Sequence, residues 1–213
     1  MHPILFQIGE FKVYSYGLAI LIAFLVGVYL ARRRAKRYGL TPQQITDASF
    51  AILLLGIIGA RVVFILQSLD YYRQNPQELW TLQFRGLTSF GGLIFGFFAA
   101  WGFAWRAKKP LLALLDTAAV PVLIGHAIGR VGCLLNGCCY GGVCDLPWGI
   151  HVAGYSELHH PAQIYDSLML VAGAWILHRI EKKGLALGQS FAAMLVVYGA
   201  ARFAYEFFRA GVT

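Results

Sequence analysis

The sequence predicts an all-α membrane protein, a polytopic helical bundle of about six transmembrane helices with its N-terminus outside. Hydrophobic residues make up 58% of the 213 residues, and charged residues only 13%. A soluble domain carries about 25% charged residues, so this chain would expose too much apolar surface in water. The net charge is +8, but the basic residues form short clusters between apolar runs, which is typical of topology signals rather than of nucleic-acid binding. We expect a single transmembrane domain over residues 1–213.

Six apolar runs account for the expected helices. About 20 residues are needed to cross the hydrocarbon core of a bilayer. No basic stretch precedes the first run, so we expect it to act as its own insertion signal rather than as a cleaved leader. Before the second run, Thr41 and Pro42 are typical of a helix start, with Thr41 as the N-cap. The runs span residues 13–31, 48–66, 88–105, 111–135, 161–177 and 188–208.

The basic residues predict which segments face outward. The segments after the first, third and fifth runs carry five, three and three Lys or Arg residues, whereas the other segments carry few. Because basic loops stay on the cytoplasmic side, the two termini and the loops at 67–87 and 136–160 are expected outside. Most of the runs then bring polar or glycine-rich groups to the outer leaflet.

Arg130 and Arg202 lie at the outward ends of the fourth and sixth runs. An arginine in the membrane is costly unless it meets water, a counter-ion or an anionic ligand. Its fork of donors suits phosphate, so two such residues could hold a phospholipid head group and stabilise a departing phosphate. In the alternative, Arg202 pairs with Glu206 one helical turn on, and Arg130 pairs with an acid elsewhere in the chain. Arg61, inside the second run, is expected to form a structural pair or to snorkel.

Four cysteines gather in one stretch with the spacing C-x4-C-C-x4-C. This spacing lacks the C-x2-C pairs of common zinc sites. A metal site completed by histidines is one alternative, but we favour a disulfide in which Cys138 or Cys139 joins Cys133 or Cys144, because an outward loop meets an oxidising compartment. The histidines considered as further metal ligands are His126, His151, His159 and His160.

The segment HHPAQIYDS opens the fifth run. Pro161 suits the first position of a helix, and the positive end of that helix favours a nearby anion or Asp166 itself. His160 is a candidate proton acceptor, because the ordinary pKa of histidine lies near physiological pH. In the alternative, His160 caps the helix and hydrogen-bonds to Asp166 or to the next loop.

In these segments the chain resembles the bacterial prolipoprotein diacylglyceryl transferase family. The matching segments follow the family's order over most of the chain, which is a stronger signal than any one of them alone. They are HPILFQIG, VYSYGL, GLTSFGGLI, GRVGCLLNGCCYGG, DLPWGI, HPAQIYDS and YGAARFAYEFFR. The resemblance implies transfer of a diacylglyceryl group from phosphatidylglycerol to a cysteine thiol of a lipoprotein precursor at the outer face of the bacterial inner membrane. It also implies that glycerol phosphate is released and that no metal or other cofactor is required.

The resemblance also assigns roles to residues. Arg130 matches the family's signature arginine and Arg202 an essential arginine of its last motif. Independently of the resemblance, we expect the acceptor thiolate to attack directly and His160 or His126 to take its proton. The residues expected to bind the substrates from their positions in the family's motifs are Tyr16, Phe90, Gly91, Asn136, Gly141, Gln163, Tyr165, Tyr198 and Glu206, of which Phe90 is not the residue that the family usually has. In the alternative, Tyr16 and Tyr198 are no more than interfacial aromatic residues.

The chain departs from the family pattern at several positions. Cys133 stands for an asparagine, Cys138 for a glutamate, Gly142 for an arginine and Phe90 for a histidine. A covalent relay through Cys138 or Cys139 is excluded, because attack on the glyceryl carbon would give a thioether, which is a poor leaving group. Two alternatives therefore accompany the transferase hypothesis: the same lipid donor with a different acceptor, and a non-catalytic lipid- or metal-binding membrane protein.

Overall fold

The computed structural model describes residues 3–8, 11–77 and 88–209, and most of these residues lie in helices. This confirms the predicted helical fold class. The chain forms two compact units, one made of residues 1–34 and 115–213 and the other of residues 35–114. Each unit is described by itself, and the expectation of a single domain stays a prediction.

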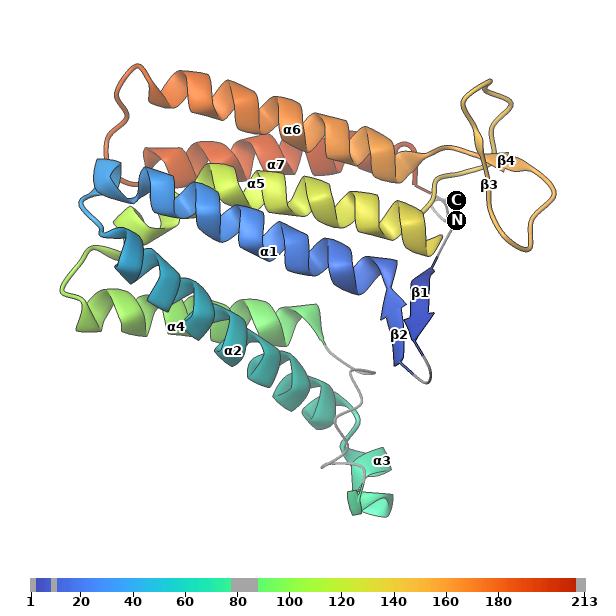
Figure 1. The fold of residues 1–213 in the computed structure, drawn as a ribbon, viewed down its shortest axis with the longest axis horizontal. Coiled ribbons are helices and arrows are strands. Elements are labelled where there is room, and N and C mark those ends of the chain that lie inside the picture. Colours follow the sequence, from blue (N-terminus) through green and yellow to red (C-terminus); the bar gives the residue numbers. More distant parts are fainter. Residues whose placement is uncertain (1–2, 9–10, 78–87, 210–213) are drawn as a thin grey trace. The chain divides into compact units, whose positions relative to one another are not determined.

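Four long helices run alongside one another in the first unit (Figure 1). They are α1 (Ser15–Arg34), α5 (Leu111–Asn136), α6 (Ala162–Glu181) and α7 (Gln189–Glu206). Four of the eight buried core residues are alanines, whose small side chains let helix backbones approach closely as in other membrane bundles. The buried core of the unit consists of Ala119, Leu123, Ala127, Leu170, Ala174, Leu177, Met194 and Ala201.

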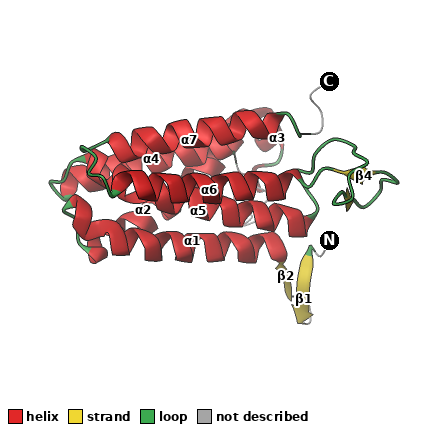
Figure 2. Cartoon of the chain, turned by 90° about the horizontal axis from the view of Figure 1, so that it is seen from above, coloured by secondary structure: helices red, strands yellow, loops and turns green. Residues whose placement is uncertain are grey.

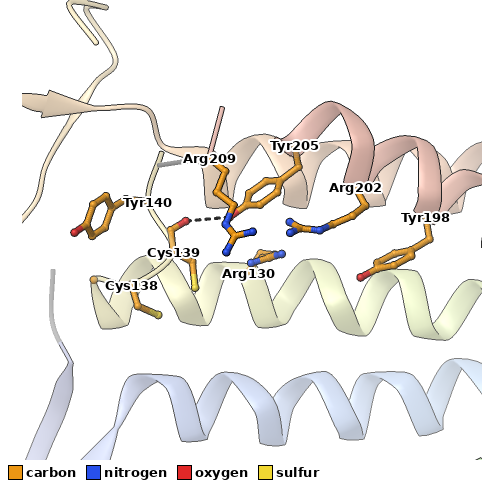
Figure 3. A pocket seen from close by; sticks show the side chains of 9 residues that line it. Arg130, Cys138, Cys139, Tyr140, Tyr198, Arg202, Tyr205 and Arg209 are labelled. Carbon is orange, nitrogen blue, oxygen red and sulfur yellow. Dashed lines mark hydrogen bonds between the residues drawn. The ribbon is translucent and has the colours of Figure 1, made fainter. Parts of the chain in front are cut away.

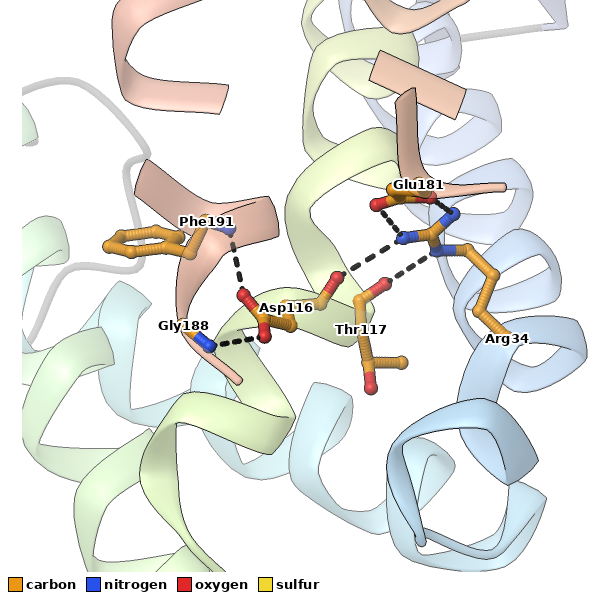
Figure 4. A network of polar contacts seen from close by, with 6 residues as sticks. All are labelled: Arg34, Asp116, Thr117, Glu181, Gly188 and Phe191. Carbon is orange, nitrogen blue, oxygen red and sulfur yellow. Dashed lines mark hydrogen bonds and ion pairs between the residues drawn. The ribbon is translucent and has the colours of Figure 1, made fainter. Parts of the chain in front are cut away.

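A buried polar network connects the end of α1, the start of α5, the end of α6 and the start of α7 (Figure 4). The guanidinium group of Arg34 donates to both carboxylate oxygens of Glu181, at 2.7 and 2.6 Å, and to two backbone carbonyls of α5. The carboxylate of Asp116 accepts the N–H groups of Gly188 at 2.6 Å and Phe191 at 2.8 Å, at the start of α7. Because Glu181 and Asp116 are fully buried, these partners offset the cost of removing both carboxylates from water.

Two short β-hairpins lie at the opposite ends of the same helices (Figures 1 and 2). In the first, β1 (Ile4–Ile8) pairs antiparallel with β2 (Phe11–Tyr14), which leads directly into α1. In the second, β3 (Ile150–His151) pairs with β4 (Leu158–His159) in the segment between α5 and α6. Neither hairpin was predicted from the apolar runs.

The second unit contains a 3₁₀ turn and three helices. They are η1 (Ala35–Tyr38), α2 (Pro42–Gln67), α3 (Leu69–Gln74) and α4 (Ser89–Arg106). The predicted N-cap of α2 is confirmed. The hydroxyl of Thr41 accepts the N–H of Gln44 at 3.1 Å, and the side-chain oxygen of Gln44 accepts the N–H of Thr41 at 2.9 Å. These two reciprocal bonds form a capping box.

Helices α2 and α4 pack closely where Gly59 faces Gly91. Near the end of α2, the guanidinium group of Arg61 lies 5.6 Å from the ring centroid of Tyr72 on α3, which is the structural contact expected of Arg61. Helix α3 occupies the start of the predicted outward loop at 67–87. Residues 78–87 of that loop lie outside the described residues.

Within the described ranges, three helical segments are long and apolar enough to cross a membrane. They cover residues 15–38, 42–67 and 111–136, with mean hydropathies of 1.8, 2.5 and 1.9. These segments support the predicted membrane location. One boundary needs correction: α6 begins at Ala162, so Pro161 occupies the cap position and not the first helical position that the sequence predicted.

Candidate functional site

A cavity of about 650 Å³ opens in the first unit between the last turns of α5, the segment that follows α5 and the last turns of α7 (Figure 3). Two of the three predicted catalytic residues, Arg130 and Arg202, reach this cavity from different helices. The residues that line it are Arg130, Gly137, Cys138, Cys139, Tyr140, Tyr198, Arg202, Tyr205 and Arg209.

Tyr205 brings two of these arginines together. Its ring centroid lies 4.8 Å from the guanidinium carbon of Arg130 and 4.7 Å from that of Arg202. Tyr205 follows Arg202 by three residues, so the two side chains share one face of α7, whereas Arg130 reaches the ring from α5. Figure 3 shows the guanidinium groups of Arg130, Arg202 and Arg209 directed into the same space. A cation–π contact stabilises its arginine by about 0.5–2 kcal/mol.

Two carboxylates partly neutralise the arginines. Nε of Arg130 lies 2.5 Å from Oδ2 of Asp166, although its N–H is not aligned for a hydrogen bond. Glu206 lies between the other two, 2.7 Å from Arg202 and 2.9 Å from Arg209. The pairing of Arg202 with Glu206, given above as the alternative, is therefore confirmed, and the acid that pairs with Arg130 is Asp166. Three guanidinium groups against two carboxylates leave one positive charge at the cavity.

The turn that ends α5 explains why the first two cysteines, Cys133 and Cys138, lie close together. Gly137 has a φ of +75°, a left-handed conformation that glycine adopts without strain, and its N–H donates to the carbonyl of Leu134 at 3.1 Å. The N–H of Cys138 donates to the carbonyl of Cys133, also at 3.1 Å. These two bonds form a Schellman turn. A C-x4-C spacing at the end of a helix thus brings two thiols together.

The residues after this turn are held in place by α6 and α7. The side-chain amide of Gln163 donates to the carbonyl of Cys138 at 2.7 Å, and the hydroxyl of Tyr205 donates to the carbonyl of Cys139 at 3.3 Å. Burial and the neighbouring Cys138 raise the pKa of the Cys139 thiol above its ordinary value. On its own, the Cys139 thiol is therefore a weak nucleophile near neutral pH.

Three segments of backbone pair beside the cavity. The N–H of Gly141 donates to the carbonyl of His160 at 2.9 Å, and the N–H of Gly142 donates to the carbonyl of Phe208 at 3.0 Å. A Cβ at Gly141 would overlap the carbonyl of Phe208. The glycine at this predicted site position therefore allows its backbone to lie close to that of Phe208. Gly141 also forms a β-bridge with Arg209, which places that arginine at the cavity.

His160, the third predicted catalytic residue, lies among aromatic side chains and does not line the cavity. Its Nδ1 lies 3.4 Å from the hydroxyl of Tyr165, and its ring centroid lies 5.6 Å from that of Phe208. The hydroxyl of Tyr165 also accepts the indole N–H of Trp148 at 2.8 Å. The ring of His160 thus meets Tyr165 and not Asp166, which was the partner named in the structural alternative.

Three of the four cysteines form a thiol group, Cys133, Cys138 and Cys139, whose Sγ atoms all lie within 4.8 Å of one another. All four cysteines are free thiols, so the predicted disulfide is not formed. Cys144 lies outside the thiol group and is buried close to Gly149. Within the described residues, none of the four histidines considered as metal ligands joins the thiol group.

The remaining predicted site residues lie outside the lining of the cavity. Tyr16 is exposed on α1 and lies near Gly132 of α5, and Asn136 is the exposed last residue of α5. Phe90 and Gly91 belong to the second unit, where the side chain of Phe90 is exposed and Gly91 is buried against α2.

Sequence reasoning did not name three of the lining residues, Tyr140, Tyr205 and Arg209. The spacing of three residues between Arg202 and Tyr205 was a usable signal, because residues at i and i+3 share a helix face. Arg209 is one of the few basic residues in the segments expected outside, and its position alone indicates no site. No pattern in the sequence indicates the role of Tyr140.

Comparisons with known proteins agree on one family. The family model described as prolipoprotein diacylglyceryl transferase matches residues 3–213. A phosphatidylglycerol–prolipoprotein diacylglyceryl transferase of Clostridium tetani is 30% identical over 98% of this chain and 86% of its own length. Relatives with the same name from Geobacter sulfurreducens and Pseudoalteromonas translucida are 34% and 32% identical over 97% of this chain, and the matches cover 82% and 79% of their own lengths.

Proposed function

The chain belongs to the prolipoprotein diacylglyceryl transferase family and is a diacylglyceryl transferase, and from this premise we propose which substrates it uses and how its cavity binds them. The donor is phosphatidylglycerol and the acceptor is the cysteine thiol of a prolipoprotein, the two substrates that appear in the names of the relatives. The phosphate of the donor binds where Arg130, Arg202 and Arg209 meet.

The convergence of three guanidinium groups on one cavity is the observation that carries this proposal. Guanidinium groups bind phosphate oxygens through paired N–H donors. The single positive charge left by three arginines and two carboxylates matches the single negative charge of a phosphodiester. A cavity of about 650 Å³ is also of the size that ligand sites have, about 300–1,000 Å³.

The same arrangement stabilises the reaction. The acceptor thiolate attacks the glyceryl carbon next to the phosphate, so a C–S bond forms while the C–O bond breaks and glycerol phosphate leaves with the electron pair. Negative charge grows on the leaving oxygen as that bond breaks. Because Tyr205 and the two carboxylates fix the guanidinium groups in advance, the arginines stabilise the transition state more than the bound lipid.

The acceptor must also lose a proton. The ring centroid of His126 lies 5.4 Å from that of Tyr198, a lining residue, and His160 contacts Tyr165. The expectation that one of these two histidines takes the proton stays a prediction. Gln163 supports the site indirectly, because it holds the carbonyl of Cys138.

The proposal places six helices across the bacterial inner membrane, with the N-terminus outside. Helices α4, α6 and α7 have 18, 20 and 18 residues, which at 1.5 Å per residue span about 27–30 Å, close to the thickness of the hydrocarbon core. They carry exposed apolar side chains such as Leu93, Leu168 and Val196, which suit contact with lipid. With the basic segments inside, the cavity faces the outer leaflet.

Mass spectrometry of a prolipoprotein peptide tests this function. The purified protein is incubated with phosphatidylglycerol and a peptide that contains one cysteine, and the same peptide with serine serves as the control. The cysteine peptide should gain the mass of one diacylglyceryl group while glycerol phosphate is released. An unmodified cysteine peptide would contradict the proposed acceptor, and modification of another thiol, an alcohol or a sugar in its place would support the alternative of a different acceptor.

A further inference from the structure

The thiol group has no role in the transfer as described so far. Its three Sγ atoms, from Cys133, Cys138 and Cys139, lie within 4.8 Å of one another. Zinc binds thiolates at about 2.3 Å, so two sulfur atoms that share one tetrahedral ion lie about 3.8 Å apart. The three thiols therefore need only small side-chain rotations to bind a common ion.

We propose that the thiol group binds one Zn²⁺ through three thiolates and that the fourth position on the ion takes the cysteine thiol of the acceptor. This inference rests on the proposed function, because the acceptor is the prolipoprotein cysteine. Three protein ligands with a fourth position open to substrate are the usual coordination of a catalytic zinc site. Thiolate ligands also favour zinc over Mg²⁺ and Ca²⁺, which prefer oxygen.

The backbone holds the three sulfur atoms together without an ion. The Schellman turn fixes Cys138 over Cys133, and hydrogen bonds from Gln163 and Tyr205 hold the carbonyls of Cys138 and Cys139. Cys139 has a φ of +62°, an uncommon value for a residue other than glycine. Such a conformation is strained and persists only where the surroundings impose it, which is frequent at ligand sites.

The location of the thiol group suits an acceptor that must reach the donor lipid. Cys138 and Cys139 line the same cavity as Arg130 and Arg202, so a thiol bound to the ion would lie in the cavity that holds the phosphate. Three thiolates on Zn²⁺ carry a net charge of −1. The arginines of the cavity favour such an anionic complex, because opposite charges attract.

The described lining of the cavity offers no other base for the acceptor thiol. It contains neither a carboxylate nor an imidazole, and Asp166 and Glu206 are engaged by arginines. A thiol that coordinates a metal ion is deprotonated, and the thiolate is the nucleophile. With the acceptor bound to the ion, the proton passes to solvent, and this route replaces proton transfer to His126 or His160. The zinc-bound sulfur then forms the C–S bond, glycerol phosphate leaves with the electrons of the C–O bond, and zinc is neither oxidised nor reduced.

Metal content tests the site without reference to catalysis. Protein purified under reducing conditions from cells supplied with zinc should contain about one zinc per chain. Cys133→Ser, Cys138→Ser and Cys139→Ser should each lose most of that zinc, whereas Cys144→Ser should retain it, because Cys144 is a free cysteine outside the thiol group. A wild-type chain without zinc, copper in place of zinc, or equal zinc in all four variants would overturn the proposal.

Cobalt substitution tests the fourth ligand, because the visible absorption of Co²⁺ depends on the number of bound thiolates. Addition of the cysteine peptide should change the spectrum of the cobalt-substituted protein, and the serine peptide should not. Identical spectra with the two peptides would overturn the binding of the acceptor to the ion.

Transfer assays on the same samples separate this inference from the proposed function. Removal of zinc with a chelator should lower the transfer rate at least tenfold, and added zinc should restore it. Full transfer by the zinc-free chain would overturn the role of the ion and leave the transferase function intact. A zinc-loaded chain that responds to the cysteine peptide but transfers no lipid would support the zinc site and contradict the proposed function.

Discussion

Tyr205 contacts the guanidinium groups of both Arg130 and Arg202 with one ring. Tyr205→Ala removes both cation–π contacts and the hydrogen bond to Cys139, whereas Tyr205→Phe keeps the ring. Two contacts of about 0.5–2 kcal/mol each predict that Tyr205→Ala slows transfer about tenfold or more. Tyr205→Phe should retain most of the activity. Equal rates for the two variants in the peptide assay would show that the ring does not position the arginines.

The sequence indicated Arg130 and Arg202 because an arginine at the end of an apolar helix is costly unless it meets water, a counter-ion or an anionic ligand. The i, i+4 spacing also indicated Glu206 as a partner of Arg202, but no local pattern indicated the acid that pairs with Arg130 or the ring that both arginines contact. The pairing of Arg130 with Asp166 joins α5 to α6, and it depends on how those helices are rotated about their axes. The disulfide prediction failed for a related reason: the Schellman turn brings Cys133 and Cys138 together as free thiols, and Cys144 lies elsewhere.

At the scale of elements, Asp116 of α5 anchors the start of α7. Its buried carboxylate accepts two backbone N–H groups, those of Gly188 and Phe191. Hydrogen bonds to a charged group stabilise by about 1.5–3 kcal/mol, so Asp116→Ala should lower the melting temperature in detergent by about 5 °C or more. Asp47→Ala is the matched control, because the exposed Asp47 bonds only to Gln43 among the described contacts. An equal melting temperature for both variants would contradict the anchoring role.

The contact between α2 and α4 gives a second prediction at this scale. A Cβ at Gly91 would overlap the carbonyl oxygen of Gly59, whereas a Cβ at Gly92 would lie 3.5 Å from the carbonyl oxygen of Gly56, an ordinary contact. Gly91→Ala should therefore force the two helices apart and destabilise the protein, and Gly92→Ala should not. Thermal unfolding of the two variants measures the difference. A destabilised Gly92→Ala with an unaffected Gly91→Ala would show that the close contact between the helices lies at Gly92 and not at Gly91.

The long helices were the most predictable elements. The run at 111–135 became α5 (Leu111–Asn136), and Thr41 and Pro42 marked the start of α2 correctly, because cap chemistry is local. The two hairpins were not predictable. Their strands are short, and the pairing of β3 with β4 is only two residues long, so they produce no alternation that a sequence pattern can detect.

At the scale of the whole molecule, the proposed topology predicts the side of each connection. A fluorescent protein fused after Tyr38, Lys109 or Gly184 should fluoresce, because these positions follow the basic segments and lie inside. Alkaline phosphatase fused after Asn75 or Tyr155 should be active outside. Activity of the phosphatase at the first three positions, with none at the last two, would invert the proposed orientation and place the cavity at the inner leaflet.

The apolar composition predicted a helical membrane protein, but the number of spans depends on how short helices such as α4 and α7 meet the lipid. The fold class can be predicted from the total hydrophobicity of each helix, which does not depend on how the helices are arranged. The site follows from helix rotation and from one turn at the end of α5, which composition does not encode.

The central claim is that Arg130 and Arg202 together hold the phosphate of the donor lipid. Its most direct test is the rate of labelled diacylglyceryl transfer by Arg130→Ala and Arg202→Ala, with Arg73→Ala as the control, because the side chain of Arg73 is 70% exposed. Loss of one donor to developing charge costs about 100-fold or more, so each site variant should fall by that factor and the control should not. Undiminished transfer by folded Arg130→Ala and Arg202→Ala would contradict the account.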